Sequence, residues 1–415
     1  MPRQRNLGSV LTAILAGLAL SGCASSTPSH DAASTMPVES PDCRARAGRL
    51  MLIGGALEDD NHPVYMRFLS VSARLCWAES CVLTPFSVTP PKVVVMTAAS
   101  GDPQASADNL TANILAHVPN SAVWVVGKAT SDAESVELIR SAGGVFFSGG
   151  DQKRITDRYL DNAHPDECTP VRAALADLLN RCGVVAGTSA GAAMMGDVMF
   201  LGGSSAEALG VRDADPDESA DPTDAAQTAP RCGARIGRGM GLLPGVLTDS
   251  HFFERDRIGR MLVALADPAV HPPRFGLGVA ENACVEVELP EMTVRGVSRA
   301  PSLLIDAANL RREGTKWSGA RVLLLTEGRE FRLADAARHA ANPDARAATL
   351  PVAPLPSVPG ERLRRRGSSG RLFAFAADHP GTLWTLDLGG WMLRAHCAAD
   401  QPPDSTWIDV EVEVK

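Results

Sequence analysis

From residue 49 the chain alternates short apolar runs with longer amphipathic stretches. The apolar runs are continuous, which is typical of strands buried on both faces of a sheet. The runs predict strands over 50–53, 93–96, 123–126, 145–147 and 183–186, and the stretches between them predict helices over 107–117, 132–141 and 171–180. Strands that alternate with helices indicate an α/β fold with a parallel sheet covered on both sides.

The predicted strands lead into turns rich in glycine and serine. In open parallel sheets, ligands bind beyond the carboxyl ends of the strands, so these turns are the first place to look for a site. Beyond residue 300 the pattern changes: 322–326 reads as a strand, and 408–414 alternates apolar and charged residues with a period of two. We therefore expect a catalytic domain over 49–300 and a β-rich C-terminal extension over 301–415.

The first residues have the pattern of an export signal. Arg3 and Arg5 precede an apolar run, 7–20, that ends in Leu-Ser-Gly-Cys23. This predicts a signal peptide over 1–22, and the tetrapeptide resembles a bacterial lipobox, with lipidation of Cys23. An ordinary signal peptide is the alternative. Residues 23–48 read as a flexible tether, so we expect a protein exported to the periplasm, the cell surface or the medium, with membrane contact only through the lipid.

Composition excludes some partners. The net charge is −8, aromatic residues make up 5% of the chain, and there is no dense basic block, so a nucleic-acid partner is not expected. The acidic stretch 204–235 reads as a solvated loop, with a flap that attracts cationic substrate as the alternative.

The cysteines suggest disulfides, because an exported protein matures in an oxidising compartment. Eight of the nine cysteines remain when Cys23 is set aside. A helix between Cys168 and Cys182 would hold these two apart, whereas Cys76 and Cys81 could close a small loop. No metal-binding or cofactor-binding spacing occurs, so we expect neither a metal nor a cofactor.

One short motif carries nucleophile chemistry. The run 187–191, Gly-Thr-Ser-Ala-Gly, fits G-x-S-x-G between a predicted strand and a predicted helix over 190–199. A sharp turn there would expose the hydroxyl of Ser189. The N–H of Ala190, with one from Gly149 or Gly150, would stabilise an oxyanion.

A serine nucleophile needs a base and a group that orients the base. His251 follows an apparent strand at 245–249, and Glu281 follows another at 275–280. We expect His251 to take the proton of Ser189 and Glu281 to hold the imidazole. The alternatives are a core or surface histidine and a solvated turn carboxylate.

Four runs together resemble the cyanophycinases of peptidase family S51. They are 149–152, 183–192, 239–245 and 249–260, and the resemblance covers about 49–300. It implies a parallel-sheet sandwich like that of the class I glutamine amidotransferases (flavodoxin-like), a homodimer, and hydrolysis of cyanophycin to β-Asp-Arg dipeptides.

The resemblance also implies roles for individual residues. Ser189, His251 and Glu281 match the nucleophile, the base and the third member of the family's triad. The positions that match substrate contacts are Gln152, Asp249, Ser250, Arg255, Arg257 and Arg260. Guanidinium groups suit the carboxylate and amide oxygens of an aspartate polymer.

Three departures affect the expected specificity. Ser250 stands where the family usually has glutamine, Ala280 precedes Glu281 where it usually has aspartate, and the Gly54-Gly55 motif is followed by other residues than usual. Aspartyl or isoaspartyl dipeptides are therefore an alternative substrate, and an inactive surface lipoprotein that binds ligand in the same pocket is another alternative. A cysteine-dependent amidotransferase is disfavoured because residue 189 is serine.

Overall fold

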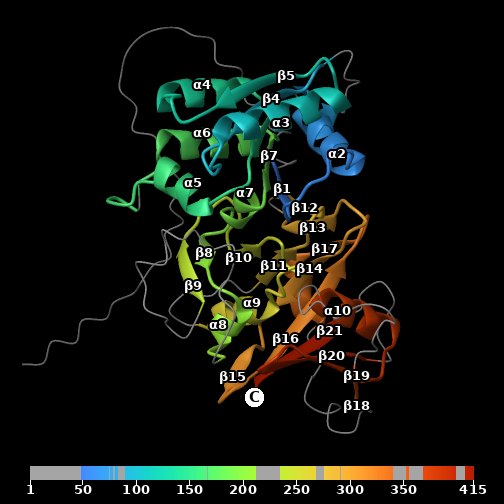
Figure 1. Cartoon of the computed structure of the whole chain (residues 1–415). Coiled ribbons are helices and arrows are strands. Elements are labelled where there is room, and N and C mark those ends of the chain that lie inside the picture. Colours follow the sequence, from blue (N-terminus) through green and yellow to red (C-terminus); the bar gives the residue numbers. More distant parts are fainter. Residues whose placement is uncertain are drawn as a thin grey trace, which may run out of the picture. The chain divides into compact units, whose positions relative to one another are not determined.

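The computed structural model describes residues 48–73, 75–77, 80–82, 89–165, 167–211, 234–267, 275–289, 291–339, 352–354, 368–398 and 407–415. Two large sheets organise these residues (Figure 1). The predicted signal peptide, Cys23, the tether and the acidic residues 212–233 lie outside the described residues, so the structure leaves the predictions for them open.

The first sheet has eight strands and carries the nucleophile. Its order is β17-β13-β12-β1-β7-β6-β4-β5. The neighbouring strands β1, β7, β6, β4 and β5 run parallel to one another. Its strands are β1 (Arg49–Ile53), β4 (Lys92–Met96), β5 (Ala122–Val126), β6 (Gly144–Phe147), β7 (Val184–Thr188), β12 (Cys284–Glu288), β13 (Thr293–Gly296) and β17 (Glu330–Arg332). The chain passes from β4 to β5 on one side and from β6 to β7 on the other, so the strand order reverses between β4 and β6. Doubly wound sheets bind ligands at such a point.

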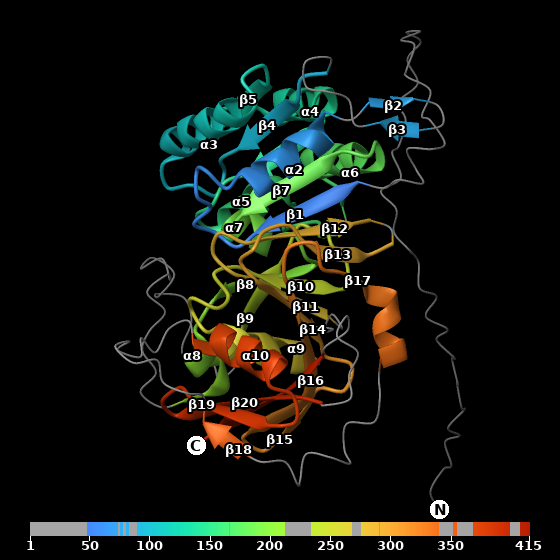
Figure 2. The same ribbon diagram turned by 90° about the vertical axis from the view of Figure 1, so that its right-hand side faces the viewer.

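Helices cover both faces of this sheet (Figure 2). α2 (His62–Ser72) and α3 (Pro103–His117) pack on one face, and α4 (Asp132–Ser141), α5 (Gln152–Tyr159) and α6 (Pro170–Asn180) pack on the other. Three of these helices begin at an N-cap residue. The side chains of Asp102, Ser131 and Thr169 accept hydrogen bonds from the first-turn N–H groups of α3, α4 and α6. Adjacent residues of β1 point into opposite cores, with Leu50 and Leu52 on one side and Met51 and Ile53 on the other.

The second sheet brings the remaining candidate groups to the site. Its order is β18-β19-β20-β21-β16-β14-β11-β10-β8-β9, with β15 paired to β16. β10 runs parallel to both β8 and β11. Its strands are β8 (Val198–Gly202), β9 (Arg235–Arg238), β10 (Val246–Asp249), β11 (Phe275–Val279), β14 (Ser302–Asp306), β15 (Arg311–Glu313), β16 (Lys316–Leu325), β18 (Val352–Pro354), β19 (Leu383–Asp387), β20 (Trp391–Cys397) and β21 (Ile408–Val414).

Shorter elements complete the fold. They are the hairpin of β2 (Leu75–Trp77) and β3 (Ser80–Val82), the helices α7 (Ala190–Ala193), α8 (Ser205–Leu209), α9 (Ile258–Ala266) and α10 (Ser368–Asp378), and the 3-10 helix η3 (Leu333–His339). Within the described part of the chain, none of the helices combines the length and the apolar character that crossing a bilayer requires.

The α/β prediction and the β-containing C-terminal part are confirmed, whereas the helix predicted over 190–199 is wrong. α7 ends at Ala193, and Val198 already begins β8. The carbonyls of Met194, Met195 and Gly196 accept hydrogen bonds from the backbone of 240–243. These long-range bonds take the place of the intrahelical bonds that the apolar sequence alone favours.

The boundary predicted at residue 300 stays a prediction. The second sheet joins strands from both sides of it, because β14 and β16 continue the ladder begun by β10 and β11. The disulfide prediction also stays open, although Cys284 and Cys397 are buried free thiols. In the β2–β3 hairpin, Cys76 lies opposite Cys81 in the backbone register.

Candidate active site

Ser189 occupies a strained turn between β7 and α7. Its φ is 52° and its ψ is −109°, a region that residues with a side chain seldom adopt. The flanking glycines make the turn possible: a Cβ at Gly187 would lie 2.2 Å from the carbonyl oxygen of Gly191, and one at Gly191 would lie 2.7 Å from that of Phe147. The strand, the strained serine and the helix start have the geometry of a nucleophile elbow.

Two further side chains extend from Ser189 in a continuous hydrogen-bonded chain. The Ser189 Oγ lies 2.8 Å from His251 Nε2, and His251 Nδ1 lies 2.6 Å from Glu281 Oε1. Ser189 follows β7 of the first sheet, whereas His251 and Glu281 follow β10 and β11 of the second. The structure therefore brings together three predicted residues that are up to 92 positions apart in the sequence.

The end of β1 connects all three turns. The carbonyl of Ile53 accepts from the N–H of Ser189 at 2.9 Å, that of Gly54 accepts from His251 at 2.7 Å, and that of Gly55 accepts from Asn282 at 2.8 Å. These three consecutive carbonyls thus bind the backbone at, or next to, each member of the Ser–His–Glu chain.

The surroundings of His251 favour its neutral form. Burial lowers the pKa of the imidazole below its ordinary value, and the positive charge of Arg255 lowers it further, while the hydrogen bond to Glu281 acts in the opposite direction. A neutral imidazole whose Nδ1–H donates to Glu281 has its Nε2 lone pair directed at the Ser189 hydroxyl. His251 is therefore suited to accept a proton near neutral pH.

A cleft of about 590 Å³ opens beside the serine. Its walls come from the turns after β1, β4, β6, β7 and β10 and from α2 and α3. Gly149 and Gly150 line it next to Ser189 and Thr188. Among the described residues, no carbonyl accepts from the N–H of Gly149, Gly150 or Ala190, so these groups are available to an oxyanion next to Ser189.

Asp249, Arg257 and Arg260 form a buried ion network behind the histidine. Arg257 Nη1 donates to Asp249 Oδ1 at 3.0 Å and to the carbonyl of Ser250 at 2.7 Å. Arg260 donates to both carboxylate oxygens of Asp249, at 2.6 and 2.8 Å, and also to the carbonyl of Gly203. All of these charged side chains are at most 8% exposed. In this structure they bind one another and the backbone next to His251.

The remaining predicted contacts lie at the margins of the site. Gln152 begins α5, and its Nε2 donates to the carbonyl of Phe200 in β8 at 2.6 Å. Ser250 is buried, and its N–H donates to Asp249 Oδ1. Arg255 is half-buried and acts on His251 through its charge. None of these three side chains, nor the Asp249 network, is among the residues that line the cleft.

Sequence reasoning gave no role to Gly55 and Glu254. At Gly55, whose φ is 99°, a Cβ would lie 2.2 Å from His251 Cε1, so the bare backbone makes room for the ring. Glu254 Oε2 accepts from the N–H of Glu281 at 3.1 Å, and burial raises the pKa of this carboxyl. The Gly-Gly pair after the first strand could have indicated from sequence that Gly55 lies at the site. The contact of Glu254 with Glu281 joins two distant segments and is visible only in the structure.

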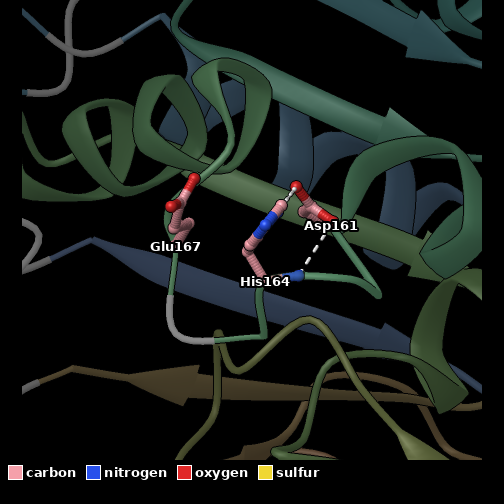
Figure 3. A group of neighbouring side chains, drawn as sticks. All are labelled: Asp161, His164 and Glu167. Atoms are coloured by element: carbon pink, nitrogen blue, oxygen red, sulfur yellow. Dashed lines mark hydrogen bonds and ion pairs between the residues drawn. The ribbon is translucent and has the colours of Figure 1, made fainter.

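A half-buried Asp161 and the exposed His164 and Glu167 form a separate group in the α5–α6 loop (Figure 3). Their ligand-type atoms lie within 4.8 Å of one another. The Asp161 carboxylate accepts from the N–H groups of Ala163 and His164 and contacts the His164 ring at 3.0 Å. None of the three lines the cleft, so the group has no part in the chemistry at Ser189.

Part of the chain is similar in sequence to known proteins. The curated cyanophycinase of Trichormus variabilis is 35% identical over 152 residues, which are 36% of this chain and 41% of that protein. The cyanophycinase of Synechococcus elongatus is 31% identical over 180 residues, 42% of this chain and 46% of that protein. The chain is similar to cyanophycinases. The resemblance seen in the motifs is thereby confirmed, although the chain spans less than half the length of these relatives.

More distant comparisons add little. No protein-family model matches the chain. A peptidase from an acI-B1 Actinobacterium aligns with a TM-score of 0.43 at 14% identity, covering 69% of this chain and 97% of that structure. A putative peptidase E from Listeria monocytogenes aligns with a TM-score of 0.37 at 12% identity, covering 61% and 100%. Likeness at these scores carries no argument about function, which has to come from the site.

Proposed function

We propose that this protein is a serine peptidase of the cyanophycinase type. The observation that carries the proposal is the hydrogen-bonded chain from Ser189 through His251 to Glu281, built on a strained elbow at the edge of a cleft. The similarity to cyanophycinases supports the same reaction class.

The proposed reaction follows from the positions of these groups. Ser189 Oγ attacks the substrate carbonyl while His251 Nε2 takes the hydroxyl proton. The N–H groups of Ala190 and of Gly149 or Gly150 stabilise the oxyanion, and Glu281 stabilises the imidazolium. His251 then protonates the leaving amine, and water hydrolyses the acyl-enzyme by the reverse proton path.

The charge of the cleft supports cyanophycin as substrate. Among the described residues that line the cleft, Asp102 is the one carboxylate and none is a lysine or an arginine. The hydroxyls of Ser100 and Ser106 lie near Asp102 and hydrogen-bond to each other at 2.8 Å. A wall of this kind suits a guanidinium group, such as the arginine carried by each aspartate of cyanophycin.

The deciding experiment tests residues 24–415, called the mature chain, and their Ser189→Ala variant on insoluble cyanophycin. Release of β-Asp-Arg by the wild type, with at least a 10³-fold lower rate in the variant, is the expected result. Mass spectrometry identifies the products. An equal rate in the variant would refute the mechanism, whatever the substrate.

A panel of short peptides separates the alternatives. Isoaspartyl dipeptides with and without arginine are the matched pair. Cleavage of both with cyanophycin left intact would move the assignment to an isoaspartyl dipeptidase. Failure of the wild type to cleave any substrate, or to react with a fluorophosphonate at Ser189, would favour a binding lipoprotein.

We further propose that the protein is exported, anchored by lipid at Cys23, and active as a homodimer. The basic start, the apolar run 7–20 and Leu-Ser-Gly-Cys23 support the anchor, and the resemblance supports the dimer. Incorporation of labelled palmitate into the wild type, but not into Cys23→Ser, tests the anchor. A monomer mass in light scattering would refute the dimer.

A further inference from the structure

The turn that carries His251 is held in an unfavourable backbone conformation at two points. It spans 250–257, between β10 and α9, and both His251 and Asp256 have positive φ, 46° and 45°. Residues with side chains keep such angles only where neighbouring groups over-determine them. The contacts of Asp256 therefore bear on the position of His251.

Asp256 connects this turn to two distant segments. Its carbonyl accepts from Ser205 Oγ of α8 at 2.6 Å, and its Oδ1 accepts from the N–H of Ser369 at 2.9 Å. Ser369 belongs to the first turn of α10, where backbone N–H groups have no partner within the helix. The Asp256 carboxylate thus caps a C-terminal helix from 113 residues away, and the carboxylate and the helix dipole stabilise each other.

An apolar contact joins the same two elements. The rings of Phe253 and Phe373 lie 6.4 Å apart, and a Cβ at Gly370 would lie 3.0 Å from the Phe253 ring. Phe253 is 5% exposed and Phe373 is fully buried. α10 therefore contacts the turn through both a hydrogen bond and a packed ring.

We propose that α10 positions His251 and that Asp256 is the positioning residue through which it acts. α10, which lies in the C-terminal region, then supports the active site from outside it. α10 fixes Asp256 and Phe253, these fix the turn, and the turn places the imidazole between Ser189 and Glu281. This proposal rests on the proposed serine peptidase mechanism, and it assigns a role to a region that lies outside the motifs shared with cyanophycinases.

The test compares three variants of the full mature chain. Asp256→Gly keeps the positive φ and removes the carboxylate, whereas Asp256→Asn keeps both the φ preference and an oxygen acceptor. Asp306→Asn is the control, since it weakens another buried carboxylate contact, the ion pair of Asp306 in β14 with Arg321 in β16, and leaves the bond between Asp256 and α10 in place. The readouts are the rate of Ser189 phosphonylation by a fluorophosphonate, its pH profile, and the titration of the His251 ring by NMR.

The expected result is a fall of about 10- to 100-fold in phosphonylation for Asp256→Gly, because small displacements of a catalytic group have effects of this size. Asp256→Asn should restore most of the rate, and Asp306→Asn should keep it despite lower stability. Of these three variants, only Asp256→Gly should shift the NMR titration of His251. Phe373→Leu, which trims the ring contact, should lower the rate in the same direction and serves if Asp256→Gly does not fold.

Two outcomes separate the failure of this proposal from failure of the proposed function. A folded Asp256→Gly with the wild-type rate, pH profile and His251 titration would overturn the positioning role and leave the peptidase mechanism intact. A wild type that does not react at Ser189 would overturn the mechanism. The NMR titration would then still report whether α10 fixes the ring.

Discussion

The serine turn and the histidine turn are built in opposite ways. Ser189 is held by its own neighbours, because Gly187 and Gly191 permit one tight turn within five residues. His251 is held from several distant parts of the chain: Gly54 binds its N–H, Glu281 binds its ring, and the Asp249 network binds the backbone beside it. A nucleophile can thus be encoded locally, whereas its base depends on the assembly of a second sheet.

The two turns also differ in what supports them energetically. Around Ser189 the constraint is steric, and the groups involved are uncharged backbone atoms. Near His251, the buried Asp249 carboxylate accepts hydrogen bonds from the buried side chains of Arg257 and Arg260. Removing one member of such a network costs about 3–5 kcal/mol, because a buried charge is left without its partner. The histidine turn is therefore the more vulnerable of the two to single substitutions.

The largest effect expected on the histidine side comes from Glu281→Gln. The amide cannot stabilise an imidazolium, and it can present an N–H where the ring needs an acceptor. We expect kcat to fall about 10³- to 10⁴-fold with an unchanged melting temperature. Steady-state kinetics on cyanophycin measures this, and a loss below tenfold would show that Glu281 does not orient His251.

An intermediate effect is expected at the strand end that both turns share. Gly55→Ala places a Cβ where the His251 ring now lies and strains a residue with φ of 99°. The ring should be displaced, and we expect about a 10²-fold lower rate of Ser189 phosphonylation. Gly245→Ala is the matched control, since it adds a Cβ at a φ of 72° with nothing within 4 Å. Equal rates in both variants would contradict the steric argument.

The smallest effect is expected from Arg255→Gln, which changes the charge near His251 but not the contacts that hold its ring. Arg255→Gln removes a positive charge that lowers the pKa of His251, so the pKa should rise. Because His251 acts in its neutral form, the acid limb of the pH–rate profile should move to higher pH. Activity well above that limb should be unchanged. A limb that stays in place or moves to lower pH would show that Arg255 does not act electrostatically on the imidazole.

The sequence predicted the parallel sheet and placed Ser189, His251 and Glu281 at strand ends, because buried strands and tight glycine turns depend on short-range rules. It did not predict that Val198 begins a strand, since the bonds from 240–243 to Met194 and its neighbours join distant segments. Nor could spacing show that Arg257 and Arg260 face Asp249, because a charged helix face has the same pattern in solvent.

The three carbonyls that end β1 have a mechanical consequence. Ile53, Gly54 and Gly55 each bind a different turn of the Ser–His–Glu chain, so thermal displacement of that strand end carries all three turns in the same direction. The separations between the reacting atoms then vary less than the positions of the atoms themselves. Amide hydrogen exchange should report this as a common opening event for residues 189, 251 and 282.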